Sequence, residues 1–179
     1  MNKPDWKCEA KQTVHQNDYW KVLRENVRFP DGELHCYHSV STEDSVLVLP
    51  ILSDGSIVLV RQFRYLQQRW SIELPGGGIN ALENPEEAAR RELLEECGCA
   101  ATELRPAGNF APCVGVMSES CYVFGASAEL IREPCFDRWE VAERLICSPE
   151  EVNGLIRCGR MWSGMSITAW VLAAKMLDT

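Results

Sequence analysis

The chain has 179 residues, of which 46% are hydrophobic and 25% are charged. This composition provides enough apolar material for a globular core, and it excludes a disordered, a collagen-like or a disulfide-stapled chain. No apolar stretch approaches the roughly 18–20 residues that a membrane-spanning helix needs, and the N-terminus lacks the apolar core of a secretory signal. We therefore expect a cytoplasmic protein that does not enter membranes.

The net charge of -8 and the sequence pI of about 5.0 restrict the kinds of partner. Such a balance disfavours binding to nucleic acid, which requires a basic face, and a polyanionic substrate would need divalent cations beside it. The nine cysteines are an odd number without a Cys-x-x-Cys pair, and the three histidines all lie near the N-terminus. We therefore expect free thiols in a reducing compartment and no zinc site.

Turn signals and apolar, β-branched runs predict the strands. The first fifteen residues are polar, which is typical of a loosely ordered segment. Pro30-Asp31-Gly32 and Ser53-Asp54-Gly55 are hairpin turns, and Pro75 ends a short strand because it has no N–H for a ladder. The expected strands are, in chain order, residues 19–27, 34–40, 45–51, 57–63, 70–74, 104–110, 119–126 and 141–147.

The strongest helix signal lies over residues 85–97. Asn84 is suited to the N-cap and Glu87 to the third position of a capping box, while Gly98 is suited to a left-handed C-cap. Further helices are expected over residues 150–157 and 166–177, the latter opened by Ser166. Strands that come first, with helices interspersed later, predict an α/β fold in which helices cover a mixed sheet.

The helix over residues 85–97 carries an unusual group of acidic side chains. At 100° per residue, Glu92, Glu95 and Glu96 share one arc of about 100°. These carboxylates repel one another and lie in the last turns, where the helix dipole disfavours anions. Two interpretations are open, namely a solvated acidic face or a site for a hard divalent cation such as Mg²⁺.

The residues around this group form a 23-residue pattern with fixed spacing. Gly77 is followed by five residues and Glu83, then by seven residues and Arg91-Glu92-Leu93, and after single spacers by Glu95-Glu96 and Gly98-Cys99. The pattern resembles the Nudix hydrolase signature at every fixed position, although the family usually has a larger aliphatic residue in place of Cys99. The resemblance favours the metal interpretation.

The resemblance implies a fold, a cofactor and a set of ligands. The expected fold is a Nudix-type α/β/α sandwich with a mixed β-sheet, preceded by an N-terminal β-hairpin region. The expected cofactor is Mg²⁺, with Mn²⁺ as a possible substitute. The implied metal ligands are Glu92, Glu95, Glu96 and the carbonyl group of Gly76, while Glu83 is expected to support the loop through Arg91.

Outside the signature, the chain resembles the ADP-ribose and nucleoside-diphosphate-sugar pyrophosphatase branch of the family. The segments that carry this resemblance are 60–65, 70–77, 148–152 and 166–169. It implies hydrolysis of a nucleoside diphosphate sugar to a nucleoside monophosphate and a sugar phosphate. Arg64 is the first candidate for a phosphate or ribose contact. Glu73 either orients Arg64, holds a metal or forms a purely structural ion pair. Arg61 is a second candidate for this contact. It lies three residues from Arg64, so in a regular strand the two face opposite ways and one of them is structural.

The branch resemblance also implies a homodimer. Residues 1–40 are expected to form an N-terminal segment and hairpin that take part in dimerisation, and residues 41–179 the hydrolase domain. Aromatic side chains of the hairpin are candidates for stacking on the base of the substrate, with core packing as the alternative role. These candidates are Trp20, Phe29 and Tyr37.

The residue that acts as general base is the least defined. The acidic loop that supplies it in this branch corresponds to residues 136–140, where Glu140 is the first candidate. Glu119 is the second candidate and Glu143 the third. The alternatives for the whole chain are a Nudix hydrolase of a dinucleoside polyphosphate, a coenzyme or a capped RNA, and a non-catalytic sensor that binds a nucleotide sugar.

Overall fold

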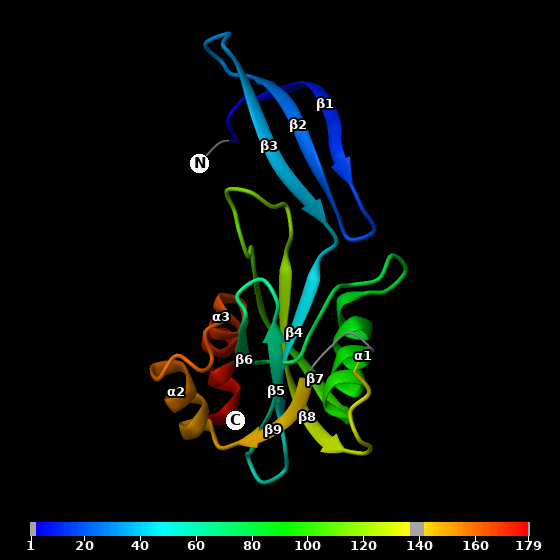
Figure 1. Cartoon of the computed structure of the whole chain (residues 1–179), viewed down its shortest axis with the longest axis vertical. Helices are drawn as coiled ribbons and strands as arrows, with labels where there is room; N and C mark the ends of the chain where they lie inside the picture. Colours follow the sequence, from blue (N-terminus) through cyan, green and yellow to red (C-terminus); the bar gives the residue numbers. More distant parts are fainter. Residues whose placement is uncertain (1–2, 137–141, 179) are drawn as a thin grey trace. The chain divides into compact units, whose positions relative to one another are not determined.

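The computed structural model describes residues 3–136 and 142–178 of the chain (Figure 1). The chain folds as two compact units. The first comprises residues 3–43 and Ala111–Ser120, and the second comprises residues 44–110 with 121–136 and 142–178.

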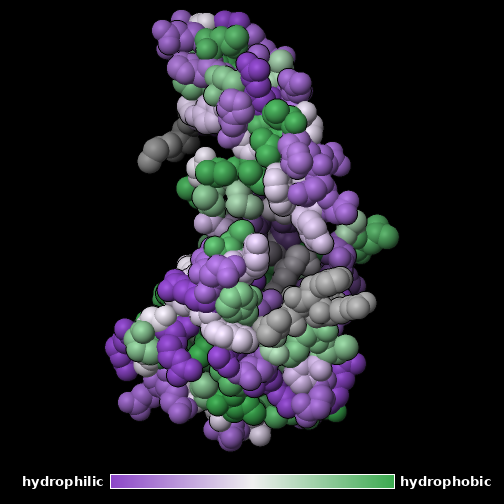
Figure 2. Space-filling model, in the orientation of Figure 1, coloured by the Kyte–Doolittle hydropathy of each residue, from purple (hydrophilic) through white to green (hydrophobic). Residues whose placement is uncertain are grey.

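The first unit contains an antiparallel sheet of three strands in the order β1-β2-β3. These strands are β1 (Lys7–Gln16), β2 (Trp20–Arg28) and β3 (Leu34–Thr42). The predicted hairpin corresponds to β2 and β3, but the expectation of a loosely ordered N-terminus is wrong from Lys7 onward. Strand β1 is exposed along its whole length, so it has no buried face to impose an alternating pattern, and its backbone pairing with β2 is invisible in the sequence. Figure 2 shows hydrophilic side chains over much of the visible surface of this sheet.

The second unit contains a sheet of six strands, in the order β6-β5-β4-β8-β7 with β9 paired to β5. Strand β4 is parallel to β8, while the other pairs are antiparallel, so the sheet is mixed. The strands are β4 (Ser45–Ile51), β5 (Ile57–Arg64), β6 (Arg69–Glu73), β7 (Cys99–Phe110), β8 (Cys121–Leu130) and β9 (Ala142–Cys147).

Helices cover both faces of this sheet. Alternate residues of β4 and β5 divide between two buried clusters, with Val46 and Val58 in one and Leu47 and Ile57 in the other. Helix α1 (Pro85–Cys97) packs into the first cluster, and α2 (Pro149–Arg157) and α3 (Gly164–Ala173) pack into the second. The expected α/β/α sandwich is thereby confirmed. None of the helices in the described ranges is long and apolar enough to cross a membrane.

The C-terminal helix begins earlier than predicted. Ser163 is the N-cap of α3 and accepts a hydrogen bond from the N–H of Ser166. Ser166 lies inside the helix, where its buried hydroxyl accepts the N–H of Leu74 at 3.2 Å. Both serines fit a cap by sequence, and only the tertiary contact to Leu74 decides between them. A short 3-10 turn, η1 (Ala174–Asp178), replaces the last helical residues.

Candidate active site

Helix α1 has the predicted bounds because local residues fix its ends. The Asn84 side chain accepts the N–H of Glu87 at 3.0 Å, and the Glu87 carboxylate accepts the N–H of Asn84 at 2.9 Å. At the other end, Gly98 has the left-handed φ of 63° that glycine adopts without strain. The helix therefore holds Glu92, Glu95 and Glu96 in its last two turns.

The glycines after β6 continue as extended backbone beside β4. The N–H of Val48 donates to the carbonyl oxygen of Pro75 at 2.9 Å, and the N–H of Val46 donates to that of Gly77 at 2.9 Å. A Cβ atom added to Gly76 would lie 2.9 Å from Leu47 Cα. Only glycine therefore allows the backbone to approach β4 this closely at position 76.

Two of the three predicted ligand side chains meet this glycine backbone. Glu96 Oε2 accepts the N–H of Gly76 at 2.8 Å. The carboxylate of Glu92 lies directly over Gly77, where an added Cβ would be 2.8 Å from Glu92 Cδ. The Glu92 side chain is 12% exposed. The fold thus brings Gly76, Glu92 and Glu96 together, although they are up to twenty residues apart in sequence.

Arg91 lies among the carboxylates. Its guanidinium donates to both carboxylate oxygens of Glu83 at 2.9 Å, to Glu92 Oε1 at 2.7 Å and to Glu95 Oε2 at 3.2 Å. The expected pairing of Glu83 with Arg91 is therefore present, and Glu95 is the most exposed of these acidic side chains at 47%. Across residues 3–136 and 142–178, no three Asp, Glu, His or Cys side chains form a metal-binding group by themselves.

The pair of Glu83 and Arg91 predicts a pH-dependent stability. The hydrogen bonds from Arg91 hold the pKa of the Glu83 carboxyl below its ordinary value of 4.5. A lowered pKa stabilises the folded state above that ordinary value, and the stabilisation is lost as the pH falls through the lower, folded-state pKa. We expect Glu83→Gln to reduce the free energy of unfolding at pH 7 by about 1–3 kcal/mol. Urea titrations at pH 7 and pH 3.5 should show this deficit shrinking at the acidic pH, and an equal deficit at both would contradict the prediction.

Arg64 and Glu73 form an ion pair on the sheet face that α1 covers. Strands β5 and β6 pair without a bulge, and Val60 stands opposite Glu73. Since Val60 belongs to the cluster on the α1 side, Glu73 and Arg64 share that face. Two hydrogen bonds join them, from Arg64 Nε at 2.8 Å and from Nη2 at 2.5 Å. Glu73 is almost fully buried, so a carboxylate inside the protein fixes the position of the Arg64 guanidinium.

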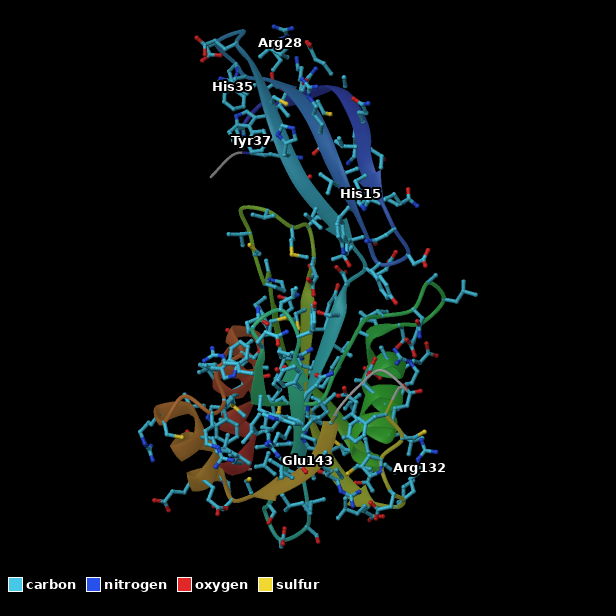
Figure 3. The ribbon with its side chains drawn as sticks, viewed as in Figure 1. His15, Arg28, His35, Tyr37, Arg132 and Glu143 are labelled. Atoms are coloured by element: carbon cyan, nitrogen blue, oxygen red, sulfur yellow. The ribbon has the colours of Figure 1, made fainter. Side chains whose placement is uncertain are left out.

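Arg61 lies on the opposite face, as strand alternation predicts. It stands opposite Ile72, which belongs to the cluster packed by α2 and α3. Its guanidinium lies 4.0 Å from the ring centroid of Trp70 and donates to Glu143 at 2.6 Å. Figure 3 labels Glu143 on the ribbon of β9. These contacts favour a structural role for Arg61, and they engage the carboxylate of the third base candidate.

The remaining predicted site residues do not lie with the α1 carboxylates in the described part of the second unit. Glu140 lies outside the described residues. Glu119 is half-buried in the first unit, which also contains Trp20 and Tyr37.

The two aromatic candidates lie on opposite faces of the three-stranded sheet. Trp20 stands opposite Thr42, and Tyr37 is five residues before Thr42 on β3, an odd number that places their side chains on different faces. Tyr37 lies near Trp6, and Phe29 stacks on both Trp6 and His35; Figure 3 labels Tyr37 and His35.

Two residues near the site carried no recognisable sequence signal. The Ser71 hydroxyl is buried without a hydrogen-bond partner among the described residues, on the same face as Glu73. Arg144 of β9 stands opposite Val60 and donates to the carbonyl oxygen of Cys97 at 2.8 Å. Both positions depend on strand pairing between distant segments, which a local pattern does not reveal.

Comparison with known proteins places the chain in a family. The sequence model of the NUDIX domain family matches residues 41–166 of this chain. The ADP-ribose pyrophosphatase of Bacillus subtilis (strain 168) is 32% identical over 124 residues, which are 69% of this chain and 67% of that protein. A CMP-5'-(N-acetyl-N-hydroxy-3-aminopropyl)phosphonate hydrolase of Streptomyces rubellomurinus is 26% identical over 164 residues, or 90% of this chain and 79% of its own.

A crystal structure of an ADP compounds hydrolase is similar in fold. It superimposes with a TM-score of 0.85 at 20% sequence identity, and the match covers 99% of this chain and 96% of that one. The family match spans the glycine backbone, helix α1 and the six-stranded sheet, which together form the candidate site. The chain therefore belongs to the NUDIX family.

Proposed function

We propose that the protein is a Mg²⁺-dependent hydrolase that cleaves the diphosphate bond of a nucleoside diphosphate sugar of the ADP-ribose type. The products are a nucleoside monophosphate and a sugar phosphate. The observation that carries the proposal is the convergence of Glu92 and Glu96 on the backbone of Gly76 and Gly77. The proposal is supported by relatives from Bacillus subtilis and Mycobacterium tuberculosis, at 32% and 29% identity, that are named ADP-ribose pyrophosphatases.

The donor atoms fit a hard divalent cation. The carboxylates of Glu92, Glu95 and Glu96 and the carbonyl oxygen of Gly76 are the oxygen ligands that Mg²⁺ prefers, and Mn²⁺ accepts the same set. Arg91 already supplies one positive charge to Glu92 and Glu95, and the Glu95 side chain is 47% exposed. When bound, Mg²⁺ supplies Lewis-acid stabilisation of the diphosphate. Without a cation, the net charge of -8 would repel the substrate.

Arg64 is the proposed phosphate or ribose contact. Its guanidinium is planar and presents paired donors that suit phosphate oxygens. Glu73 holds it through two hydrogen bonds on the α1 side of the sheet, so the orientation of the donors is fixed before a substrate binds. We assign Glu73 the orienting role, because its buried carboxylate is already engaged by Arg64.

Glu140 remains the first candidate for the general base, and Glu119 the second. Such a base, by accepting a proton from the attacking water, contributes about 10²–10⁴-fold to the rate. The N-terminal role also stays a prediction, with residues 1–40 in a homodimer interface and Trp20 or Tyr37 beside the base of the substrate. The cytoplasmic location is likewise part of the proposal.

The proposal is tested with the purified protein and a panel of substrates. ADP-ribose, ADP-glucose, GDP-mannose and UDP-glucose are incubated side by side with Mg²⁺, with Mn²⁺ or with EDTA, and the nucleotide products are resolved by chromatography. A CMP-linked compound joins the panel because the Streptomyces relative is named for one. We expect Mg²⁺-dependent release of a nucleoside monophosphate, fastest from an ADP-linked sugar, and none in EDTA.

Other results of this experiment would favour one of the alternative functions. Turnover of a dinucleoside polyphosphate, a coenzyme or a capped RNA in the absence of sugar hydrolysis would replace the proposed substrate class. Binding of ADP-ribose without turnover in either metal would indicate a non-catalytic sensor and overturn the proposed activity.

A further inference from the structure

The C-terminal end of α1 lacks a positive charge of its own. Its last turn contains no basic residue, while the carboxylates of Glu95 and Glu96 lie there. The helix dipole disfavours anions at this end, and the final carbonyl groups need hydrogen-bond donors from elsewhere. The N–H of the Gly98 cap reaches only the carbonyl oxygens of Leu93 and Leu94, so the carbonyl groups that follow them need donors from other segments.

A distant stretch of backbone supplies several of the missing donors. The N–H of Cys135 donates to the carbonyl oxygen of Glu95 at 2.7 Å. The N–H groups of Ile131 and Arg132 donate to that of Gly98 at 2.9 and 3.1 Å. In Figure 1 the segment after β8 runs beside α1, and Figure 3 labels Arg132 near the end of that helix. The fit is close, because a Cβ on Gly98 would lie 2.9 Å from the carbonyl carbon of Arg132.

Arg144 completes this arrangement from β9. It stands opposite Val60 and hence on the α1 side of the sheet. Its Nη1 donates to the carbonyl oxygen of Cys97 at 2.8 Å and to that of Arg132 at 3.1 Å, and its side chain is only 18% exposed. One guanidinium thus joins the helix end to residues 131–135. We call these five residues and Arg144 the clasp.

The clasp holds the backbone on both sides of Glu96. The carbonyl group before this residue belongs to Glu95 and accepts Cys135, and the carbonyl group after it belongs to Cys97 and accepts Arg144. The side chain of Glu96 meanwhile accepts the N–H of Gly76. A shift of the helix end would therefore move Glu96 relative to the glycine backbone.

We propose that Arg144 is a positioning residue that fixes the end of α1, and with it Glu96, in the geometry that binds the divalent cation. The inference rests on the proposed function. Arg144 touches neither the cation nor the substrate in this role; it acts through the carbonyl group of Cys97. Supporting residues of this kind typically change metal affinity about 10–100-fold when they are replaced.

The test measures binding of Mn²⁺ alone, without substrate, by the loss of the free-ion signal in electron paramagnetic resonance. Arg144→Met is compared with Arg90→Met, a matched control that removes an arginine–carbonyl hydrogen bond between the same helix and Ala101 on β7. Thermal unfolding without metal is recorded for each protein. We expect the dissociation constant for Mn²⁺ to rise about tenfold in Arg144→Met and to stay at the parental value in Arg90→Met.

Each outcome has a defined meaning. Parental Mn²⁺ affinity in Arg144→Met would overturn the inference, and a lowered melting temperature beside it would show a merely structural role. If Arg144→Met does not fold, Arg144→Lys takes its place under the same criterion, because lysine keeps the charge but lacks the planar fork of donors. Absence of Mn²⁺ binding in the parental protein would instead overturn the metal-dependent function itself.

Discussion

Glu96→Gln is expected to keep the fold and to lose at least about 100-fold in kcat/KM, since even residues that only support metal ligands change affinity 10–100-fold. The amide oxygen of glutamine can still accept the N–H of Gly76, which Glu96 accepts at 2.8 Å. The packing of α1 against the glycine backbone is therefore retained. The neutral amide is a much weaker partner for Mg²⁺ than a carboxylate. Initial rates with ADP-ribose across a series of Mg²⁺ concentrations measure the loss of kcat/KM, and a thermal unfolding curve measures whether the fold is kept.

The matched control changes the same charge at the other end of the same helix. Glu86 lies exposed in the first turn of α1, and Glu86→Gln is expected to retain the parental rate and Mg²⁺ dependence. Loss of activity in both variants would indicate a general effect of charge. Parental activity in Glu96→Gln, with an unchanged Mg²⁺ requirement, would mean that this carboxylate is not a ligand.

The part of the site that lies on α1 could be predicted because its signals are local. The capping box of Asn84 and Glu87 and the left-handed Gly98 set the ends of the helix within a few residues of chain. Helical periodicity then fixes which carboxylates share a face. The family signature adds the glycine backbone, whose spacing from the helix is itself a sequence feature. For the same reason, strand alternation alone correctly separated Arg61 from Arg64.

The rest depended on pairing between distant segments. Strand β1 pairs with β2 but buries neither of its faces, so its sequence has no alternating hydrophobic pattern that would predict a strand. The cap of α3 at Ser163 depends on a contact between Ser166 and Leu74, which lie far apart in sequence. Arg144 reaches Cys97 only because β9 pairs with β5 at Val60. In each case the deciding interaction joins residues whose proximity only the folded sheet creates.

Gly77→Ala is expected to leave stability nearly unchanged while it removes most of the activity. The φ of Gly77 lies outside the left-handed region, so the backbone accepts alanine. Alanine also lowers the conformational entropy of the unfolded chain, which raises the free energy of unfolding by about 0.4–1 kcal/mol. The new Cβ would lie 2.8 Å from Glu92 Cδ. Because that carboxylate ends a flexible side chain, it can move aside at small cost, but it then leaves its place over the glycine. A displacement of about 1 Å at a reacting centre costs on the order of 100-fold in rate.

The neighbouring glycine provides the contrast that makes this prediction specific. A Cβ on Gly76 would lie 2.9 Å from Leu47 Cα, and the backbone of a central strand cannot swing away as a side chain does. Gly76→Ala should therefore reduce the free energy of unfolding by about 3 kcal/mol, as measured by urea titration. If Gly77→Ala instead lost stability like Gly76→Ala, the carboxylate of Glu92 would be rigidly packed. If Gly77→Ala kept full activity with ADP-ribose and Mg²⁺, the position of Glu92 over this glycine would not matter for catalysis. The two adjacent glycines therefore distinguish what the fold requires from what the proposed metal ligand Glu92 requires.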